Sequence, residues 1–183
     1  MSLSLLSQDR LDILAALAKQ CLPLRGQYVE CGVYMGGSAL HIAEAIKGHD
    51  RRLYLYDRFG LGLPAPGPHD LHKRGAFGGN DFEAVYAMMP DHVSMYQGLF
   101  KDTLNMSPQY HVSFAHIDAD LYKSTMDCLH ALYRRMLPGG VMIFDDYGGV
   151  MEPGVKMALQ EFLADKPEAI LPLVTEQAVV FKV

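Results

Sequence analysis

Short apolar segments alternate with helical segments along most of this chain, and this alternation constrains the fold more than any other feature. Residues 27–33 (QYVECGV), 111–118 (HVSFAHID) and 141–146 (VMIFDD) are nearly continuous in hydrophobicity, as is typical of strands buried on both faces. Residues 36–48 and 121–140 have the apolar spacing and the glycine ends of helices. Strands that alternate with helices predict a parallel sheet covered on both sides.

The remaining segments extend the same pattern. Strands are expected at residues 52–57 and 92–98, and helices at residues 7–20, 81–90 and 153–165. Proline at the start of the last of these segments suits the first turn of a helix. Helices and strands are therefore expected to alternate along most of the chain.

The C-terminal residues predict one antiparallel element. Residues 169–174 (AILPLV) and 178–183 (AVVFKV) are separated by only three residues, as in a hairpin. The chain therefore predicts an α/β fold, a doubly wound, Rossmann-like sheet of seven mostly parallel strands that ends in an antiparallel hairpin. With 183 residues and no linker or repeat, we expect one domain over residues 1–183, with an N-terminal helical segment at residues 1–26.

Composition bears on the compartment and on the partners. The net charge of −5 and the absence of a basic stripe argue against nucleic acid as a partner. No segment approaches the roughly 20 apolar residues of a membrane span, and the N-terminus lacks the features of a signal peptide. Cys21, Cys31 and Cys128 lack metal-ligand spacing and are expected to be buried thiols. We expect a soluble, cytoplasmic protein with a small-molecule partner, and apolar surfaces on its terminal segments that allow a homo-oligomer.

Residues 60–80 interrupt the alternation. The segment GLGLPAPGPHDLHKRGAFGGN is rich in glycine and proline and has no periodicity. Loops of about 20 residues are uncommon inside domains and are often functional. We expect a lid over an active site, in which His69 and His72 either touch an acceptor or are solvated.

Acidic residues follow several of the predicted parallel strands. Asp57 ends the second strand, Asp118 ends the fourth, and Asp145 and Asp146 end the fifth. Ligands of open α/β sheets bind outside the carboxyl ends of the strands, so four carboxylates are expected on one rim. Clustered carboxylates repel one another, and a divalent cation such as Mg²⁺ would relieve that repulsion. The alternative is that Asp146 caps a helix and that Asp118 pairs with Lys123 or an arginine.

The first predicted strand leads into the turn VECGVYMGGSA. Gly32, Gly36 and Gly37 would let the backbone approach a ligand, and the next helix offers free N–H groups at its N-terminus. Glu30 lies in an otherwise apolar strand, where it suits an amine-bearing ligand better than a pyrophosphate. The alternative is an ordinary strand-to-helix turn. Asp57 lies where such sheets bind ribose hydroxyls, or it simply caps a loop.

Five motifs resemble, in order and spacing, the metal-dependent macrocin O-methyltransferase family: VECGVYMGGSA, YDRFGLGLP, YQGLFKDTL, IDADLYKSTMDCLHALY and PGGVMIFDDYG. Members of this family use S-adenosylmethionine to methylate hydroxyls, typically on sugars of bacterial natural products. The resemblance covers roughly residues 27–165 and implies a class I methyltransferase domain. The D-x-D-L-Y-x-S-T segment followed by P-G-G and D-D-Y is specific, whereas the glycine turn alone is not.

The resemblance also implies how the methyl donor binds. The glycine turn would hold the methionine part of S-adenosylmethionine, Asp57 its ribose, and residues 98–100 would flank its adenine. The implied donor-binding residues are Glu30, Gly32, Gly36, Gly37, Ser38, Asp57, Gly98, Leu99, Phe100 and Asp118.

The same resemblance implies that Asp118, Asp145 and Asp146 bind Mg²⁺ or another divalent cation, and that Asp118 is the general base. A cation would lower the pKa of an acceptor hydroxyl, and a carboxylate would accept its proton. His116 is expected to pack beside this site rather than to act as a ligand. Ala119 departs from the family, which usually has glycine there.

The first predicted strand begins at residue 27, whereas family members tend to carry longer N-terminal segments that cover the acceptor. We therefore expect an acceptor site that is open, formed by residues 60–80, or completed by another subunit. Two alternatives to the methyltransferase remain from the sequence. One is a metal-dependent hydroxylase-type relative of the same fold, and the other is a non-catalytic protein that binds S-adenosylmethionine.

Overall fold

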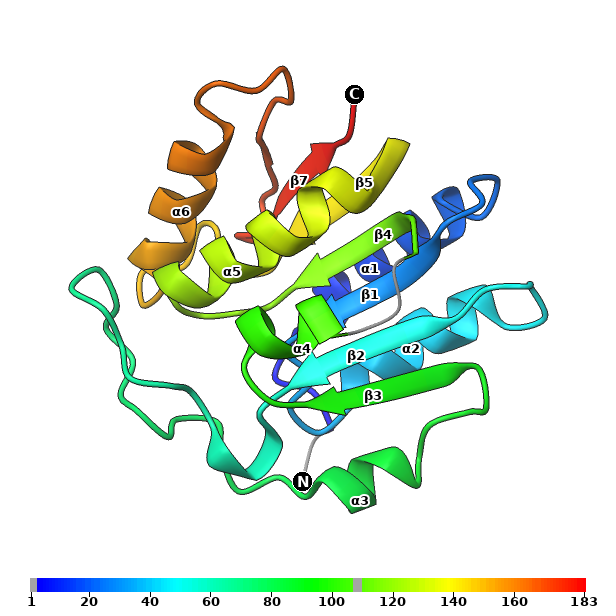
Figure 1. Ribbon diagram of the computed structural model, residues 1–183, viewed down its shortest axis with the longest axis horizontal. Coiled ribbons are helices and arrows are strands. Elements are labelled where there is room, and N and C mark those ends of the chain that lie inside the picture. The colour runs from blue at the N-terminus through cyan, green and yellow to red at the C-terminus, as the bar shows by residue number, and fades with distance from the viewer. Residues whose placement is uncertain (1–2, 107–109) are drawn as a thin grey trace.

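A seven-stranded sheet lies between two layers of helices in the computed structural model, which describes residues 3–106 and 110–183 (Figure 1). The strands are β1 (Gln27–Cys31), β2 (Leu53–Asp57), β3 (Val93–Gln97), β4 (Val112–Ile117), β5 (Met136–Phe144), β6 (Leu171–Pro172) and β7 (Ala178–Phe181). Their order is β3-β2-β1-β4-β5-β7-β6. The first five strands are parallel, and β7 runs antiparallel to both β5 and β6. The predicted doubly wound α/β sheet with a terminal hairpin is therefore confirmed.

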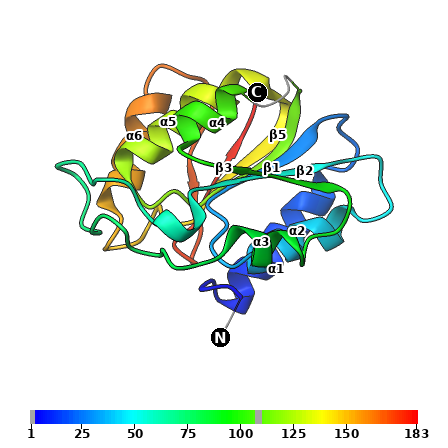
Figure 2. The same cartoon turned by 60° about the horizontal axis from the view of Figure 1, so that its bottom comes forward.

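The helices are α1 (Gln8–Gln20), α2 (Gly37–Ile46), α3 (Phe82–Tyr86), α4 (Phe100–Met106), α5 (Tyr122–Leu132) and α6 (Pro153–Leu163), with 3-10 turns η1 (Phe59–Leu61) and η2 (Tyr133–Arg135). Helices α1, α2 and α3 cover one face of the sheet, and α4, α5 and α6 cover the other (Figure 2). Successive strand residues alternate between the two cores: Tyr28 packs with α1 and α2, whereas Val29 packs with α5. Both faces of the central strands are thus buried, as their continuous hydrophobicity predicts.

Two predictions of element boundaries were wrong. The helix expected over residues 121–140 ends at Leu132, and Pro138, Gly139 and Gly140 lie inside β5 rather than in a helix stop. The pairing between β4 and β5 is irregular at this point, and Gly139 has a φ of +81°, so a Pro-Gly-Gly segment fits an irregular strand as well as a turn. The short helix α4 was not predicted.

Residues 62–80, within the predicted lid, contain no helix or strand. The base of this loop is closed by two backbone hydrogen bonds, from Leu63 N to Ala76 O (2.8 Å) and from Gly75 N to Leu63 O (2.9 Å). The loop reaches across to α5, where the backbone N–H of Tyr122 donates to Asp70 Oδ1 (2.7 Å). Its function as a lid stays a prediction.

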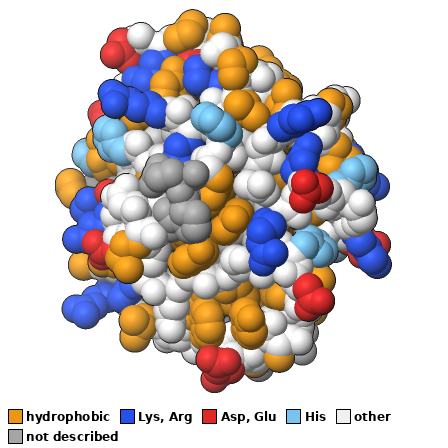
Figure 3. Space-filling view, turned by 45° about the vertical axis from the view of Figure 1, so that its right-hand side comes forward, with side chains coloured by type: hydrophobic (Ala, Val, Ile, Leu, Met, Phe, Trp, Pro, Cys, Tyr) orange, Lys and Arg blue, Asp and Glu red, His pale blue; other side chains and the backbone are white. Residues whose placement is uncertain are grey.

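Among the described residues, the longest helices fall short of the length and hydrophobicity needed to cross a membrane. The face seen in Figure 3 carries basic side chains dispersed among apolar and acidic ones.

Candidate functional site

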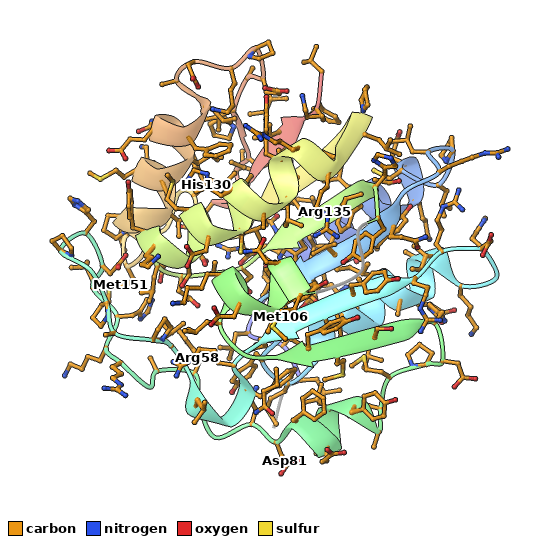
Figure 4. All side chains as sticks on the ribbon, in the orientation of Figure 1. Arg58, Asp81, Met106, His130, Arg135 and Met151 are labelled. Carbon is orange, nitrogen blue, oxygen red and sulfur yellow. The ribbon has the colours of Figure 1, made fainter. Side chains whose placement is uncertain are left out.

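A cavity of about 480 Å³ opens at the carboxyl ends of the parallel strands. Its wall combines residues 3–6, the turn after β1, the segment after β2, the start of α4 and the acidic segments after β4 and β5. Arg58, which follows β2 and is labelled in Figure 4, also lines it. This volume lies within the range of small-molecule sites, and the position is the one expected for an open α/β sheet.

Most of the residues predicted from sequence lie in this wall, but four do not. Those that line the cavity are Gly32, Ser38, Asp57, Gly98, Leu99, Phe100, Asp118 and Asp146. Those of the predicted set that lie behind the lining are Glu30, Gly36, Gly37 and Asp145. Glu30 is fully buried within β1, and Gly37 donates its N–H to Leu3 O (3.0 Å), so the N-terminal segment covers that part of the turn.

Glycine is required at position 32 because the backbone of Asp118 lies directly against it, whether or not a ligand binds there. Its φ is +93°, and a Cβ at this position would lie 1.8 Å from the carbonyl oxygen of Asp118. The backbone N–H of Asp118 in turn donates to Cys31 O (2.8 Å). The end of β1 and the acidic segment after β4 are therefore fixed against each other.

Asp57 stabilises the turn after β1. Its Oδ2 accepts hydrogen bonds from the N–H groups of Val33 (2.7 Å) and Tyr34 (2.9 Å), and its Oδ1 accepts one from Phe59 N (2.8 Å). The capping role considered for Asp57 is therefore present in the structure. A contact with ribose stays a prediction.

Asp118, Asp145 and Asp146, which we call the acidic centre, converge as the sequence predicts. One carboxylate oxygen from each lies within 4.8 Å of the others. Burial, followed by repulsion from Asp146 and Asp145, raises the pKa of Asp118 well above its usual range. Burial and the charge of Asp145 raise the pKa of Asp146 to about 6. Two of the three carboxylates therefore lack enough positive charge nearby.

Asp145 differs from the other two because it has its own partners. Arg10 Nη1 donates to Asp145 Oδ2 (2.6 Å), and Gln177 Nε2 donates to Oδ1 (2.8 Å). Burial acts to raise the pKa of Asp145, but His116 and Arg10 outweigh it and lower that pKa. Sequence reasoning missed Arg10 and Gln177, since each is a common polar residue in an element remote from the acidic motifs.

His116 is fully buried beside the acidic centre, where its position in the strand suggested it would pack. Its Nδ1 lies 2.8 Å from Glu30 Oε1, and its Nε2 lies 3.8 Å from Asp145 Oδ1, too far for a direct hydrogen bond. Burial acts to lower the pKa of His116, but attraction to Asp145 and Glu30 raises it to about 9. The two carboxylates therefore favour the protonated form of His116.

A second cluster lies at the rim of the same cavity. His72 Nε2 is 2.6 Å from Glu152 Oε1 and 3.9 Å from Asp120 Oδ1, and Asp120 and Glu152 both line the cavity. Burial, then the charges of Asp146 and Glu152, raise the pKa of Asp120 well above its usual range. His72 is thus largely shielded, with 15% of its side chain exposed, whereas His69 is exposed with its ring 5.4 Å from that of Tyr122. The D-x-D motif could have identified Asp120 as a site residue, but no sequence motif marked Glu152.

The acidic centre fits a divalent cation. Carboxylate oxygens are the ligands that Mg²⁺ prefers, and three of them converge here. A cation would also remove the repulsion that raises the pKa values of Asp118 and Asp146. Asp118 and Asp146 line the cavity, so a cation held by them would be accessible to a bound molecule.

A protein-family model described as macrocin-O-methyltransferase (TylF) matches residues 1–182. A relative from Streptomyces olivaceus, named 8-demethyl-8-(2,3-dimethoxy-alpha-L-rhamnosyl)-tetracenomycin-C 4'-O-methyltransferase, is 34% identical over 139 residues, which are 67% of this chain and 53% of the relative. The demethyldecarbamoylnovobiocin O-methyltransferase of Streptomyces niveus is 33% identical over 156 residues, or 76% of this chain and 58% of that protein. The chain thus spans little more than half the length of these relatives.

Solved structures agree on the fold. The O-methyltransferase NovP superimposes with a TM-score of 0.83 and 28% identity, over 95% of this chain and 79% of NovP. The calicheamicin methyltransferase CalS11 superimposes with a TM-score of 0.78 and 22% identity, over 94% of this chain and 78% of CalS11. At the latter identity the similarity shows the fold alone.

Proposed function

Because the chain belongs to the macrocin O-methyltransferase family, we propose that it transfers a methyl group from S-adenosylmethionine to a hydroxyl of a small acceptor. A sugar or another natural-product moiety is the acceptor class suggested by the names of the relatives. The observation that carries this proposal is that Asp118 and Asp146 line one cavity together with the glycine turn. Donor and acceptor chemistry could therefore meet at the acidic centre.

We assign the donor to the part of the cavity formed by Gly32, Ser38 and residues 98–100. The N-terminus of α2 has no side-chain cap, and Ser38 in its first turn lines the cavity together with Gly32. Residues 3–6 and Phe100 add apolar surface that would exclude water from a bound nucleoside. Alignment of the two reactants within one cavity would contribute more to methyl transfer than activation of the sulfonium does.

The acidic centre would act on the acceptor. A divalent cation held by Asp118, Asp145 and Asp146 would supply Lewis acidity that lowers the pKa of an acceptor hydroxyl. Asp118 is the proposed general base, because it lines the cavity and is the residue to which the family resemblance assigns that role. The hydroxylase alternative has less support, since the relatives reported above are named methyltransferases.

The proposal can be tested with the purified protein in two steps. Isothermal titration calorimetry with S-adenosylhomocysteine, with and without Mg²⁺, should show that this nucleoside binds. Transfer of a labelled methyl group should then be measured with demethyldecarbamoylnovobiocin and simple rhamnosides, in EDTA and after Mg²⁺ is restored. Failure to bind S-adenosylhomocysteine would refute the donor assignment. Transfer at full rate in EDTA would refute the role of the cation.

A further inference from the structure

A guanidinium group lies against the acidic centre, and it comes from the N-terminal helix. We propose that Arg10 sets the affinity of the acidic centre for its divalent cation, by holding a fixed positive charge against Asp145 and Asp146. This inference rests on the proposed cation site. It assigns to α1 a function in the chemistry of the site, beyond its packing against the sheet.

The contacts of Arg10 place its charge at the acidic centre rather than in solvent. Nη1 lies 2.6 Å from Asp145 Oδ2 and 3.8 Å from Asp146 Oδ1. Nη2 lies 2.8 Å from Oε2 of Glu176, whose side chain is 57% exposed, whereas only 18% of the Arg10 side chain is exposed. Arg10 also lines the cavity. Its inner contacts are therefore shielded, and its outer contact faces solvent.

Arg10 is one member of a line of alternating charges that crosses the fold. The line runs from Glu30 in β1 through His116 in β4 and Asp145 after β5 to Arg10 in α1, and it ends at Glu176. Burial acts to lower the pKa of Arg10, but Asp145, Asp146 and Glu176 outweigh it and raise that pKa, so the guanidinium stays charged. Arg10 thus compensates the charge of Asp145.

This compensation has a consequence for cation binding. A divalent ion at the acidic centre would meet Asp145 already paired with Arg10 at 2.6 Å, and Asp146 at 3.8 Å from the same guanidinium. It would also be repelled by the Arg10 guanidinium, because like charges a few ångströms apart in a shielded site are weakly screened. Arg10 therefore lets the acidic centre fold without a cation and makes cation binding weaker and more readily reversible.

The test is a titration of the wild type and three variants with Mn²⁺, in which the concentration of free Mn²⁺ is measured by electron paramagnetic resonance. R10Q removes the charge, R10K keeps it, and E176Q removes only the exposed partner. We expect R10Q to bind Mn²⁺ at least about tenfold more tightly than the wild type, with little dependence on salt because the site is shielded. R10K and E176Q should stay within about threefold of the wild type, since both retain the cation beside Asp145.

R10K separates a charge effect from a structural one, because it keeps the positive charge but not the geometry of the guanidinium. The double variant R10Q/D118N should lose the tight binding, which would place the ion at the acidic centre. Mn²⁺ binding by the wild type with an equal or weaker affinity in R10Q would overturn the role of Arg10 and leave the cation site intact. No binding by the wild type or R10Q at millimolar Mn²⁺ would overturn both.

Discussion

Buried carboxylates lie at both ends of the parallel strands: Glu168 at the amino ends and the acidic centre at the carboxyl ends. The pKa values of the two sets are shifted in opposite directions. At the amino edge of the parallel strands, Glu168 accepts hydrogen bonds from Lys182 Nζ (2.5 Å) and from Tyr133 Oη (2.8 Å). Burial acts to raise the pKa of Glu168, but these donors lower it to about 2. At the carboxyl edge, burial and mutual repulsion raise the pKa values of Asp118 and Asp146.

The difference separates a structural charge from a functional one. Glu168 is satisfied by the chain itself, so nothing further is needed to stabilise it. Asp118 and Asp146 are less stable as charges than they would be in water, and they face a cavity. Carboxylates with raised pKa values in a cavity are typical of sites that bind a cation or exchange a proton. The two groups should therefore respond in opposite directions to mutation and to pH.

The largest expected effect concerns the acidic centre. D118N should lower methyl transfer by about 10³-fold, because it removes both a cation ligand and the proposed base. Donor binding should change little, and the free energy of unfolding should not fall, because a repelling charge is lost. Rates, titration with S-adenosylhomocysteine and urea unfolding would measure these three quantities. D165N is the matched control, since the Asp165 side chain is 84% exposed. A stable D118N protein with normal transfer would contradict the assignment.

The second prediction concerns the other edge. K182M should lower the free energy of unfolding by about 3 kcal/mol, because it leaves the fully buried Glu168 carboxylate without its cation. Binding of Mn²⁺ should be unaffected. Urea unfolding should be compared with K47M, which removes an exposed pair with Glu44 and should cost at most about 0.5 kcal/mol. Equal losses in the two variants would show that Glu168 does not depend on Lys182.

The third prediction is that pH moves the two groups in opposite directions. The folded-state pKa of Asp146, about 6, lies above its unfolded value, so its contribution to stability is present at low pH and is lost as the pH rises through 6. The pKa of Glu168, about 2, lies below its unfolded value, so its contribution is present above about pH 4.5 and is lost as the pH falls toward 2.

In EDTA, the melting temperature should therefore fall between pH 5 and pH 7, by an amount equivalent to about 1 kcal/mol. Mg²⁺ should reverse this fall at pH 7, and D146N should flatten it. E168Q should instead flatten the loss of stability at acidic pH. A melting temperature in EDTA that rises steadily from pH 5 to pH 7, in the wild type and in D146N alike, would show that folding does not raise the pKa of Asp146.

The comparison also explains what the sequence could predict. The fold followed from hydrophobic periodicity, and the convergence of Asp118, Asp145 and Asp146 followed from the rule that strand ends of a parallel sheet meet. The partners that make Asp145 different could not be predicted. Arg10 lies in an ordinary amphipathic helix, and Gln177 lies in a hairpin turn, so the contacts of both side chains depend on tertiary packing. Local patterns report which residues enter an element, but not which polar side chains meet across elements.

The smallest expected effect tests a carboxylate that combines both situations. Glu152 lines the cavity, yet it has a partner in His72, which belongs to the loop of residues 60–80. One hydrogen bond contributes about 0.5–1.5 kcal/mol, so H72Q should open the loop about two- to tenfold more often without changing global stability. Trypsin should then cleave faster after Lys73 and Arg74, which are exposed in that loop. H69Q is the control, because His69 contacts Tyr122 but no carboxylate in the described residues, and it should leave cleavage unchanged. Equal cleavage of H72Q and the wild type would mean that the contact between His72 and Glu152 does not hold the loop closed.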